Sequence, residues 1–345
     1  MNPDKDERSD LCSVLIRGQS LPGFRKALLR WYDAEKRDLP WRRNNDFYPV
    51  WISEIMLQQT RVEAVMPYFL RFMELFPDVG ALAAAEESRL LAAWSGLGYY
   101  SRARNLHRSA KTIAAAGEPR DFDSIRALAG VGDYTAAAIA SIALGEPRAA
   151  LDGNVMRVIS RLLNDAADIR AGETRRRFAE QAARLLDRRR PGDFNQAMME
   201  LGATVCTPKT PGCGKCPVAR FCDAHAAGAA AQLPVKLGRK AAREVRLDLA
   251  VLEGDGRVFL VERASSERRL AGFRELPAKK DLPGARFREA GEFTHQIVND
   301  RFRVRVWIAG GTSRLPAGEW IAAADLGGLP VTTTAKKALR IAGIL

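Results

Sequence analysis

Hydrophobic residues recur with helical spacing from about residue 20 to residue 205. The clearest case is 154–163, where five apolar residues from Val155 onward lie at i, i+3, i+4, i+7 and i+8 and so share one helix face. Pairs of Gly and Pro separate this pattern from others like it. The same spacing predicts further helices over 51–60, 62–75, 102–115 and 135–144.

The hydrophobic period changes after residue 244. Apolar and polar residues alternate through 245–251 and 302–308, which is typical of half-buried strands. A turn at 254–256 predicts a hairpin into another strand over 258–261. An Ala- and Gly-rich segment and a basic stretch come before these strands. We therefore expect a loosely ordered tail (1–19), a mainly helical domain (20–225), an interdomain linker (226–243) and a smaller α+β domain (244–345).

The charge balance favours a polyanionic partner. The 345 residues include 54 Lys and Arg against 41 Asp and Glu, a net charge of +13, and cations set against phosphates release condensed counterions. A hydrophobic fraction of 47% argues against disorder as the main state. The charged first ten residues do not resemble a secretory signal, and no apolar run reaches 18 residues. We expect no membrane contact and a cytoplasmic protein.

Four of the five cysteines lie within seventeen positions. Cys206, Cys213, Cys216 and Cys222 form C-x6-C-x2-C-x5-C in a loop rich in Pro and Gly, whereas Cys12 is a lone thiol. Structural zinc sites typically use two short Cys pairs, and this loop has only one. The spacing therefore predicts a metal or cluster site, with a [4Fe–4S] cluster favoured over zinc.

A short glycine motif joins two of the predicted helices. Gly130 and Gly132 lie two residues apart, and Thr135 begins the following helical pattern. Such a turn can point backbone N–H groups outward at a helix N-terminus, where an anion binds. A phosphate site is one interpretation of this motif, and an ordinary tight turn is the other.

Two carboxylates occupy unusual positions. Glu54 is surrounded by large apolar residues, so burial should raise its pKa and leave it able to donate a proton. Asp152 comes directly before the helix at 154–163, where the helix N-terminus should lower its pKa and keep it charged. Two carboxyl groups with separated pKa values are what glycosidic bond cleavage requires.

Several longer motifs occur together with these residues. They are LPWR (39–42), SEIMLQQTRV (53–62), GLGYYSRARNL (96–106), LAGVGDYTA (128–136), LDGNVMRV (151–158) and FNQAMMELGA (194–203). With the four-cysteine loop, they resemble the adenine DNA glycosylases, the MutY family of the endonuclease III-like helix–hairpin–helix superfamily. The resemblance implies a six-helix barrel with an iron–sulfur subdomain. It also implies excision of adenine mispaired with 8-oxoguanine or guanine in double-stranded DNA, by a monomer in the bacterial nucleoid.

The resemblance also assigns roles to single residues. Glu54 matches the general acid that protonates adenine N7, and Asp152 matches the carboxylate that stabilises the sugar cation, with Asn154 orienting it. Gln59 and Tyr99 match the positions that probe and wedge beside the opposite 8-oxoguanine. An inserted side chain fills the gap that an extruded base leaves in the duplex.

Further matches concern the base pocket and the type of reaction. Arg42, Leu57 and Gln196 match positions that line the adenine pocket. Related glycosylases that also cut the strand place a Lys after the hairpin, where this chain has Tyr134, and no Lys occurs between residues 111 and 209. The sequence therefore predicts base removal without strand cleavage.

The C-terminal hundred residues resemble, more loosely, the MutT-like (Nudix-fold) domain of the same family. The matching segments are 270–277 and the element formed by Phe293, Thr294 and His295, which the resemblance assigns to 8-oxoguanine recognition. The tryptophan that the family has in the first segment is missing, and no Nudix box is present. Nucleotide pyrophosphatase activity is therefore not expected.

Two other functions remain open from the sequence. One is an endonuclease III-like glycosylase and lyase that acts on oxidised pyrimidines, against which Tyr134 and the C-terminal domain argue. The other is a non-catalytic iron–sulfur DNA-binding regulator, which would need neither a buried acid nor a base pocket.

Overall fold

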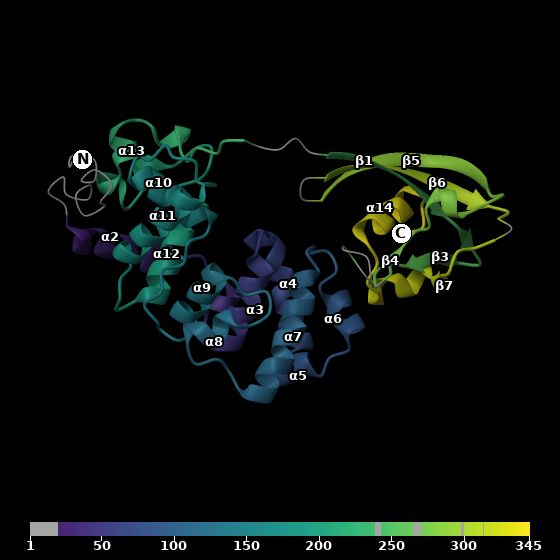
Figure 1. Ribbon diagram of the computed structural model, residues 1–345, viewed down its shortest axis with the longest axis horizontal. Coiled ribbons are helices and arrows are strands. Elements are labelled where there is room, and N and C mark those ends of the chain that lie inside the picture. The colour runs from purple at the N-terminus through teal and green to yellow at the C-terminus, as the bar shows by residue number, and fades with distance from the viewer. Residues whose placement is uncertain (1–19, 239–242, 265–269, 271, 298–299, 313) are drawn as a thin grey trace. The chain divides into compact units, whose positions relative to one another are not determined.

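The computed structural model describes residues 20–238, 243–264, 270, 272–297, 300–312 and 314–345 (Figure 1). The predicted tail, which contains Cys12, and residues 239–242 of the predicted linker lie outside these ranges. Among the described residues, one compact unit takes 20–73 and 109–238, and the other takes 74–108 and 243–345. In the described ranges, no helix combines the length and the hydropathy needed to cross a membrane.

The first unit is helical. Its helices pack with apolar faces together, and α2, α10 and α12 share one core in which the Phe24 ring lies edge-on to Phe221 at 5.6 Å. The predicted helix over 154–163 is confirmed as α10, with Val155, Val158 and Ile159 buried. The helices of this unit are α2 (Leu21–Glu35), α3 (Phe47–Leu57), α8 (Phe122–Arg126), α9 (Asp133–Ala143), α10 (Gly153–Leu162), α11 (Gly172–Leu185), α12 (Pro191–Thr204) and α13 (Asp223–Ala226), with most of α4 (Val62–Leu75).

Helix α3 ends three residues before its predicted end at residue 60. Gln59 has a φ of 59°, a left-handed conformation that an α-helix cannot continue through. The helix also begins earlier than predicted, at Phe47, with Pro49 in the first turn, where proline is tolerated. The shorter helix leaves Gln59 in an exposed turn before α4.

The second unit combines helices with two small sheets. The first sheet has the order β1-β6-β5, in which β1 runs parallel to β6 and β5 antiparallel to it. In the second sheet, β3 pairs with β2, β4 and β7. The bounds are β1 (Arg243–Val251), β2 (Glu253–Gly254), β3 (Arg257–Glu262), β4 (Arg274–Glu275), β5 (Arg286–Ile297), β6 (Asp300–Gly310), β7 (Glu319–Ala322), α5 (Val79–Ala83), α6 (Glu87–Ala93) and α14 (Thr333–Ile341). Helix α7 (Ser101–Ala116) belongs to both units.

The alternation predicted for 302–308 is confirmed in β6. Val304 and Val306 are fully buried against α14, whereas Arg303 and Arg305 are exposed. The predicted turn at 254–256 does form, but it joins β2 to β3, and the longer strand β1 pairs with β6 instead. The predicted hairpin is therefore wrong in its first strand, whereas the expected fold class, a helical part followed by a smaller α+β part, is confirmed.

Candidate active site

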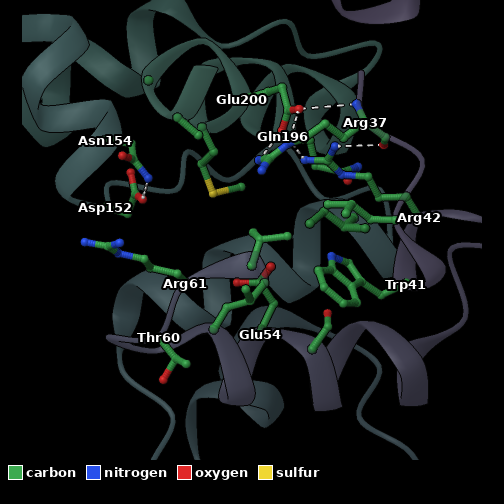
Figure 2. A pocket seen from close by; sticks show the side chains of 18 of the residues that line it. Arg37, Trp41, Arg42, Glu54, Thr60, Arg61, Asp152, Asn154, Gln196 and Glu200 are labelled. Carbon is green, nitrogen blue, oxygen red and sulfur yellow. Dashed lines mark hydrogen bonds and ion pairs between the residues drawn. The ribbon is translucent and has the colours of Figure 1, made fainter. Parts of the chain in front are cut away.

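A cavity of about 550 Å³ lies in the first unit, between α3, α9, α12 and the start of α10 (Figure 2). The structure brings seven of the residues singled out from the sequence to its walls. They are Arg42, Glu54, Leu57, Tyr134, Asp152, Asn154 and Gln196. Side chains from segments far apart in the sequence thus surround one space whose volume lies within the range of small-ligand pockets.

Glu54 lies in the middle of α3 and is 6% exposed. Its pKa is raised to about 7, chiefly by burial and in part by the neighbouring Asp152, although a hydrogen bond from Tyr134 and the charge of Arg42 lower it. The hydroxyl of Tyr134 donates that bond to Oε2 of Glu54 at 3.3 Å. The predicted direction is confirmed, and Glu54 can hold a proton near neutral pH.

Asp152 caps the N-terminus of α10. Its Oδ1 accepts the backbone N–H of Val155 at 2.7 Å, and its Oδ2 accepts Nδ2 of Asn154 at 2.8 Å. Burial nevertheless raises the pKa of Asp152 above its ordinary value, although these hydrogen bonds and Arg157 lower it. The expectation of a lowered pKa was wrong, because removal of water from the carboxylate outweighs the helix N-terminus.

Asn154 is itself held by two features that the sequence analysis missed. Nη2 of Arg157 donates to Oδ1 of Asn154 at 2.9 Å and to the carbonyl of Gly202 at 2.8 Å. A Cβ added at Gly202 would lie 2.6 Å from Cβ of Asn154, so only glycine allows α12 to approach α10 this closely. Arg157 and Gly202 therefore fix the side chain that binds Asp152.

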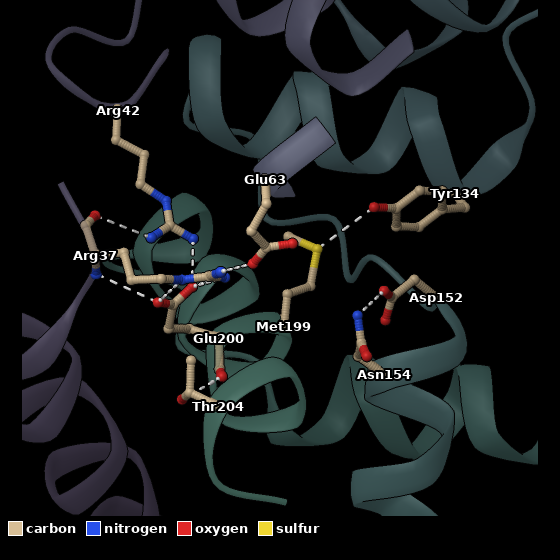
Figure 3. A network of polar contacts seen from close by, with 9 residues as sticks. All are labelled: Arg37, Arg42, Glu63, Tyr134, Asp152, Asn154, Met199, Glu200 and Thr204. Carbon is tan, nitrogen blue, oxygen red and sulfur yellow. Dashed lines mark hydrogen bonds and ion pairs between the residues drawn. The ribbon is translucent and has the colours of Figure 1, made fainter. Parts of the chain in front are cut away.

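Arg42 belongs to a buried network around Glu200 (Figure 3). The carboxylate of Glu200, with 1% of its side chain exposed, accepts two bonds from the guanidinium of Arg37 at 2.7 and 2.9 Å and one from Arg42 at 2.9 Å. Burial alone would raise the pKa of Glu200, but the bonds from Arg37 and Arg42 bring it below its ordinary value. Glu200 was not predicted from the sequence, although an acid among apolar residues was the signal that identified Glu54.

Tyr134 stands on α9 and, with Glu54 and Asp152, lines the cavity. Besides Glu54, its hydroxyl lies 3.4 Å from Sδ of Met199, and burial raises its pKa well above the ordinary value. No lysine occurs among the described residues that line the cavity. The position that the family resemblance assigns to a Schiff-base lysine therefore holds the un-ionised hydroxyl of Tyr134.

The glycine motif lies before α9, outside the lining of the cavity. Gly130 has a φ of 77°, and Gly132 is the N-cap of α9. Between them Val131 is buried, and its carbonyl accepts Nη1 of Arg126 at 2.9 Å. The motif is thus a fixed turn whose glycines precede a helix N-terminus.

Gln59 and Tyr99 share an uncommon backbone conformation. Their φ values are 59° and 50°, in the left-handed region, and both side chains are exposed. Non-glycine residues in this region cost free energy and cluster at functional sites. Gln59 belongs to the first unit and Tyr99 to the second.

The structure places the middle residue of the predicted recognition element on the opposite face of its strand from the other two. Phe293, Thr294 and His295 follow one another in β5, opposite Val304, Arg303 and Phe302 of β6. Because side chains alternate along a strand, Phe293 shares the core face, where Nζ of Lys337 lies 5.6 Å from its ring centroid. Thr294 is exposed, and burial, with the charge of Lys337, lowers the pKa of His295.

The four clustered cysteines follow α12 and pack beside α10. The pKa of the Cys216 thiol is raised to about 12, chiefly by burial and in part by the other three thiols of the loop. Sγ of Cys206 accepts Nη1 of Arg161 at 3.2 Å. Within the described ranges, no group of three or more His, Cys, Asp or Glu side chains is placed so that it could hold a metal ion.

The chain is similar to known DNA repair proteins. The family model "HhH-GPD superfamily base excision DNA repair protein" matches residues 52–184. The adenine DNA glycosylase of Homo sapiens is 34% identical to this chain, and the alignment covers 92% of this chain and 73% of the relative. The adenine DNA glycosylase of Rattus norvegicus is 46% identical, and the match covers 59% of this chain and 42% of the relative. That of Mycolicibacterium smegmatis is 43% identical, and the match covers 58% of this chain and 69% of the relative.

Solved structures show the same fold. A thermostable thymine-DNA glycosylase matches with a TM-score of 0.54 and 26% identity over 60% of this chain and 97% of its own. The structure of a non-covalent endonuclease III–DNA complex matches with a TM-score of 0.50 and 21% identity. This match covers 61% of this chain and 98% of the other. The chain spans less than half of the rat relative but nearly three quarters of the human one. It belongs to the adenine DNA glycosylase family of the HhH-GPD superfamily.

Proposed function

We propose that this protein removes adenine mispaired with 8-oxoguanine or guanine from double-stranded DNA, by hydrolysis of the N-glycosidic bond. The observation that carries the proposal is the pair of carboxyl groups on the walls of one cavity, buried Glu54 and half-buried Asp152 (Figure 2). The names of the human, rat and mycobacterial relatives support adenine as the base.

The mechanism begins with extrusion of the adenine, because its glycosidic bond cannot be reached inside the duplex. Glu54, protonated up to about pH 7, donates its proton to N7 of the base, which then leaves as neutral adenine. Ionised Asp152, held by Asn154, faces the sugar and stabilises the positive charge that develops there. Attack of water on the sugar, with release of its extra proton to solvent, completes the hydrolysis and leaves an abasic site.

Strand cleavage is not part of this mechanism. A lyase needs an amine that forms a Schiff base with the sugar, and the position that the family resemblance assigns to that lysine holds Tyr134. The pKa of Tyr134 lies well above its ordinary value, so its hydroxyl donates a hydrogen bond to Glu54 and does not act as a nucleophile.

The test uses labelled duplexes that contain A:8-oxoguanine, A:G or thymine glycol. We expect adenine release from the first two, with strand breaks only after alkali treatment. Breaks without alkali, or cleavage at thymine glycol, would favour the endonuclease III-like alternative. Binding without release of any base would favour the non-catalytic regulator.

The proposal includes a [4Fe–4S] cluster held by Cys206, Cys213, Cys216 and Cys222. Four soft thiolate donors on one loop fit such a cluster, which is larger than a single ion and so holds its ligands further apart. Its role would be structural, to fix a basic loop beside α10. Iron and sulfide analysis should give four of each per chain, as [4Fe–4S] requires. Cys216→Ser should lose them, and Cys12→Ser should not.

The remaining assignments concern the duplex around the adenine. Gly130 and Gly132 would bind a phosphate with backbone N–H groups, and Gln59 and Tyr99 would contact the opposite strand. A MutT-like domain over 244–345 would read 8-oxoguanine through β5. Because Thr294 lies on the exposed face of β5 and Phe293 on its core face, Thr294 is the residue of the two that can meet a base directly.

A further inference from the structure

The turn between α6 and α7, in the second unit, holds Tyr99 in a strained conformation. Tyr99 has a φ of 50°, and the glycines at 96 and 98 have φ values of 115° and 72°. Left-handed backbone suits glycine but costs free energy for tyrosine. The side chain is nevertheless 39% exposed, so burial of its ring does not account for the strain. Contacts elsewhere in the turn must hold this conformation.

Hydrogen bonds within the turn supply part of that support. Nε1 of Trp94 donates to the carbonyl of Gly98 at 3.1 Å, and Nη2 of Arg102 donates to the same carbonyl at 3.3 Å. The guanidinium of Arg102 lies over the rings of Trp94 and Tyr99, 5.6 and 5.3 Å from their centroids. These contacts fix the backbone at Gly98 and one face of the Tyr99 ring.

Two residues from the C-terminal part of the chain complete the support. The fully buried ring of Phe273 packs on Tyr100 with the centroids 4.1 Å apart. On the other side of the turn, Nζ of Lys336 in α14 donates to Oγ of Ser95 at 2.9 Å. Both residues contact the turn beside Tyr99 and leave Tyr99 itself exposed.

We propose that Phe273 and Lys336 are positioning residues, which hold the turn over 95–100 so that Tyr99 already has its inserting conformation before DNA binds. The proposal rests on the proposed function, in which Tyr99 wedges beside the base opposite the adenine. A side chain that is ordered in advance does not lose that freedom on binding, so the mispair is bound more tightly. The C-terminal part of the chain thus acts on the mispair through Tyr99 as well as through β5.

The binding test compares Phe273→Ala with Phe259→Ala, each in the wild type and in Tyr99→Ala. Phe259 is the matched control, since it is 2% exposed and contacts Trp320 in the same unit, away from the turn. The probe is a duplex with 8-oxoguanine opposite 2′-fluoro-adenosine, whose glycosidic bond resists cleavage. We expect Phe273→Ala to weaken binding about tenfold in the wild type and less than about twofold in Tyr99→Ala, as for coupled neighbours. An equal loss in both backgrounds, or a loss no larger than that of Phe259→Ala, overturns the proposal.

A second measurement does not depend on catalysis. Amide hydrogen exchange over 96–100 should accelerate in Phe273→Ala and in Lys336→Met, and should not change in Phe259→Ala. If Phe273→Ala does not fold, Lys336→Met alone provides the test. Unchanged exchange in both positioning variants refutes the support of the turn. If exchange accelerates but the wild type releases no adenine, the proposed function fails while the support of the turn stands.

Discussion

Replacement of Glu54 by Gln should abolish adenine release and, above pH 7, make the protein more stable. Burial raises the pKa of Glu54 from 4.5 to about 7. Between these two pH values, the folded protein therefore keeps a proton that the unfolded chain has already lost. Because the folded state then binds more protons than the unfolded state, stability falls as the pH rises from 4.5 to 7. The general acid is therefore a source of instability at neutral and alkaline pH.

The structure sets the size of this effect. A rise in pKa from 4.5 to about 7 corresponds to about 3 kcal/mol of unfolding free energy, at about 1.36 kcal/mol for each pH unit. The loss is absent below pH 4.5, where both states are protonated, and complete above pH 7, where both are ionised. Since Gln is neutral throughout, Glu54→Gln should match the wild type at pH 4 and exceed it by about 3 kcal/mol at pH 8.

Urea unfolding at one-unit steps from pH 4 to pH 8 measures the difference. The control is Glu118→Gln, which neutralises an exposed carboxylate of the same unit and should show no comparable gain. In parallel, single-turnover excision by the wild type should fall about tenfold per pH unit above pH 7, as the acid loses its proton. Equal stability of wild type and Glu54→Gln at pH 8, or near-normal excision by the variant, would refute the reasoning.

Two further variants probe the surroundings of the acids. Tyr134→Phe removes a hydrogen bond that favours ionised Glu54, so the pKa of Glu54 should rise and the alkaline limb of the pH–rate profile should move to higher pH. Gly202→Ala would place a Cβ 2.6 Å from Cβ of Asn154, and we expect a loss of about 1–3 kcal/mol in urea unfolding together with a large loss of excision. Gly192→Ala, equally crowded at 2.6 Å but against a carbonyl of α9, should lose stability and keep its excision rate. An unchanged pH profile in the first variant, or equal excision by the two alanine variants, would contradict these assignments.

The helices and strands were largely predictable because hydrophobic period is a local property. The start and end of α4 agree with the pattern over 62–75, and α10 agrees within one residue at each end. The pairing of β1 with β6 was not predictable in this way. Alternation shows which face of a strand is buried, whereas the neighbouring strand depends on connections about 50 residues long.

The same distinction between local and distant contacts applies to the candidate site. The raised pKa of Glu54 could be predicted because its apolar neighbours lie in its own helix. The pKa direction of Asp152 could not, because the burial that outweighs its helix cap arises only in the folded cavity, whose walls come from segments far apart in the sequence. The same holds for Glu200, whose partner Arg37 is 163 residues away in the sequence.

The different tasks of the two acids follow from where each lies on its helix. Burial raises the pKa of both Glu54 and Asp152, so loss of water does not decide which one keeps a proton. Glu54 lies inside α3, where backbone N–H groups are already bonded within the helix, and its one hydrogen bond from the described part of the chain comes from the hydroxyl of Tyr134. Asp152 lies before the first turn of α10, where N–H groups have no partner in the helix, and it accepts one of these together with the amide of Asn154. A single proton shared by the cavity therefore resides on Glu54, the acid that must donate it, and leaves the charge on Asp152, which must meet the sugar cation.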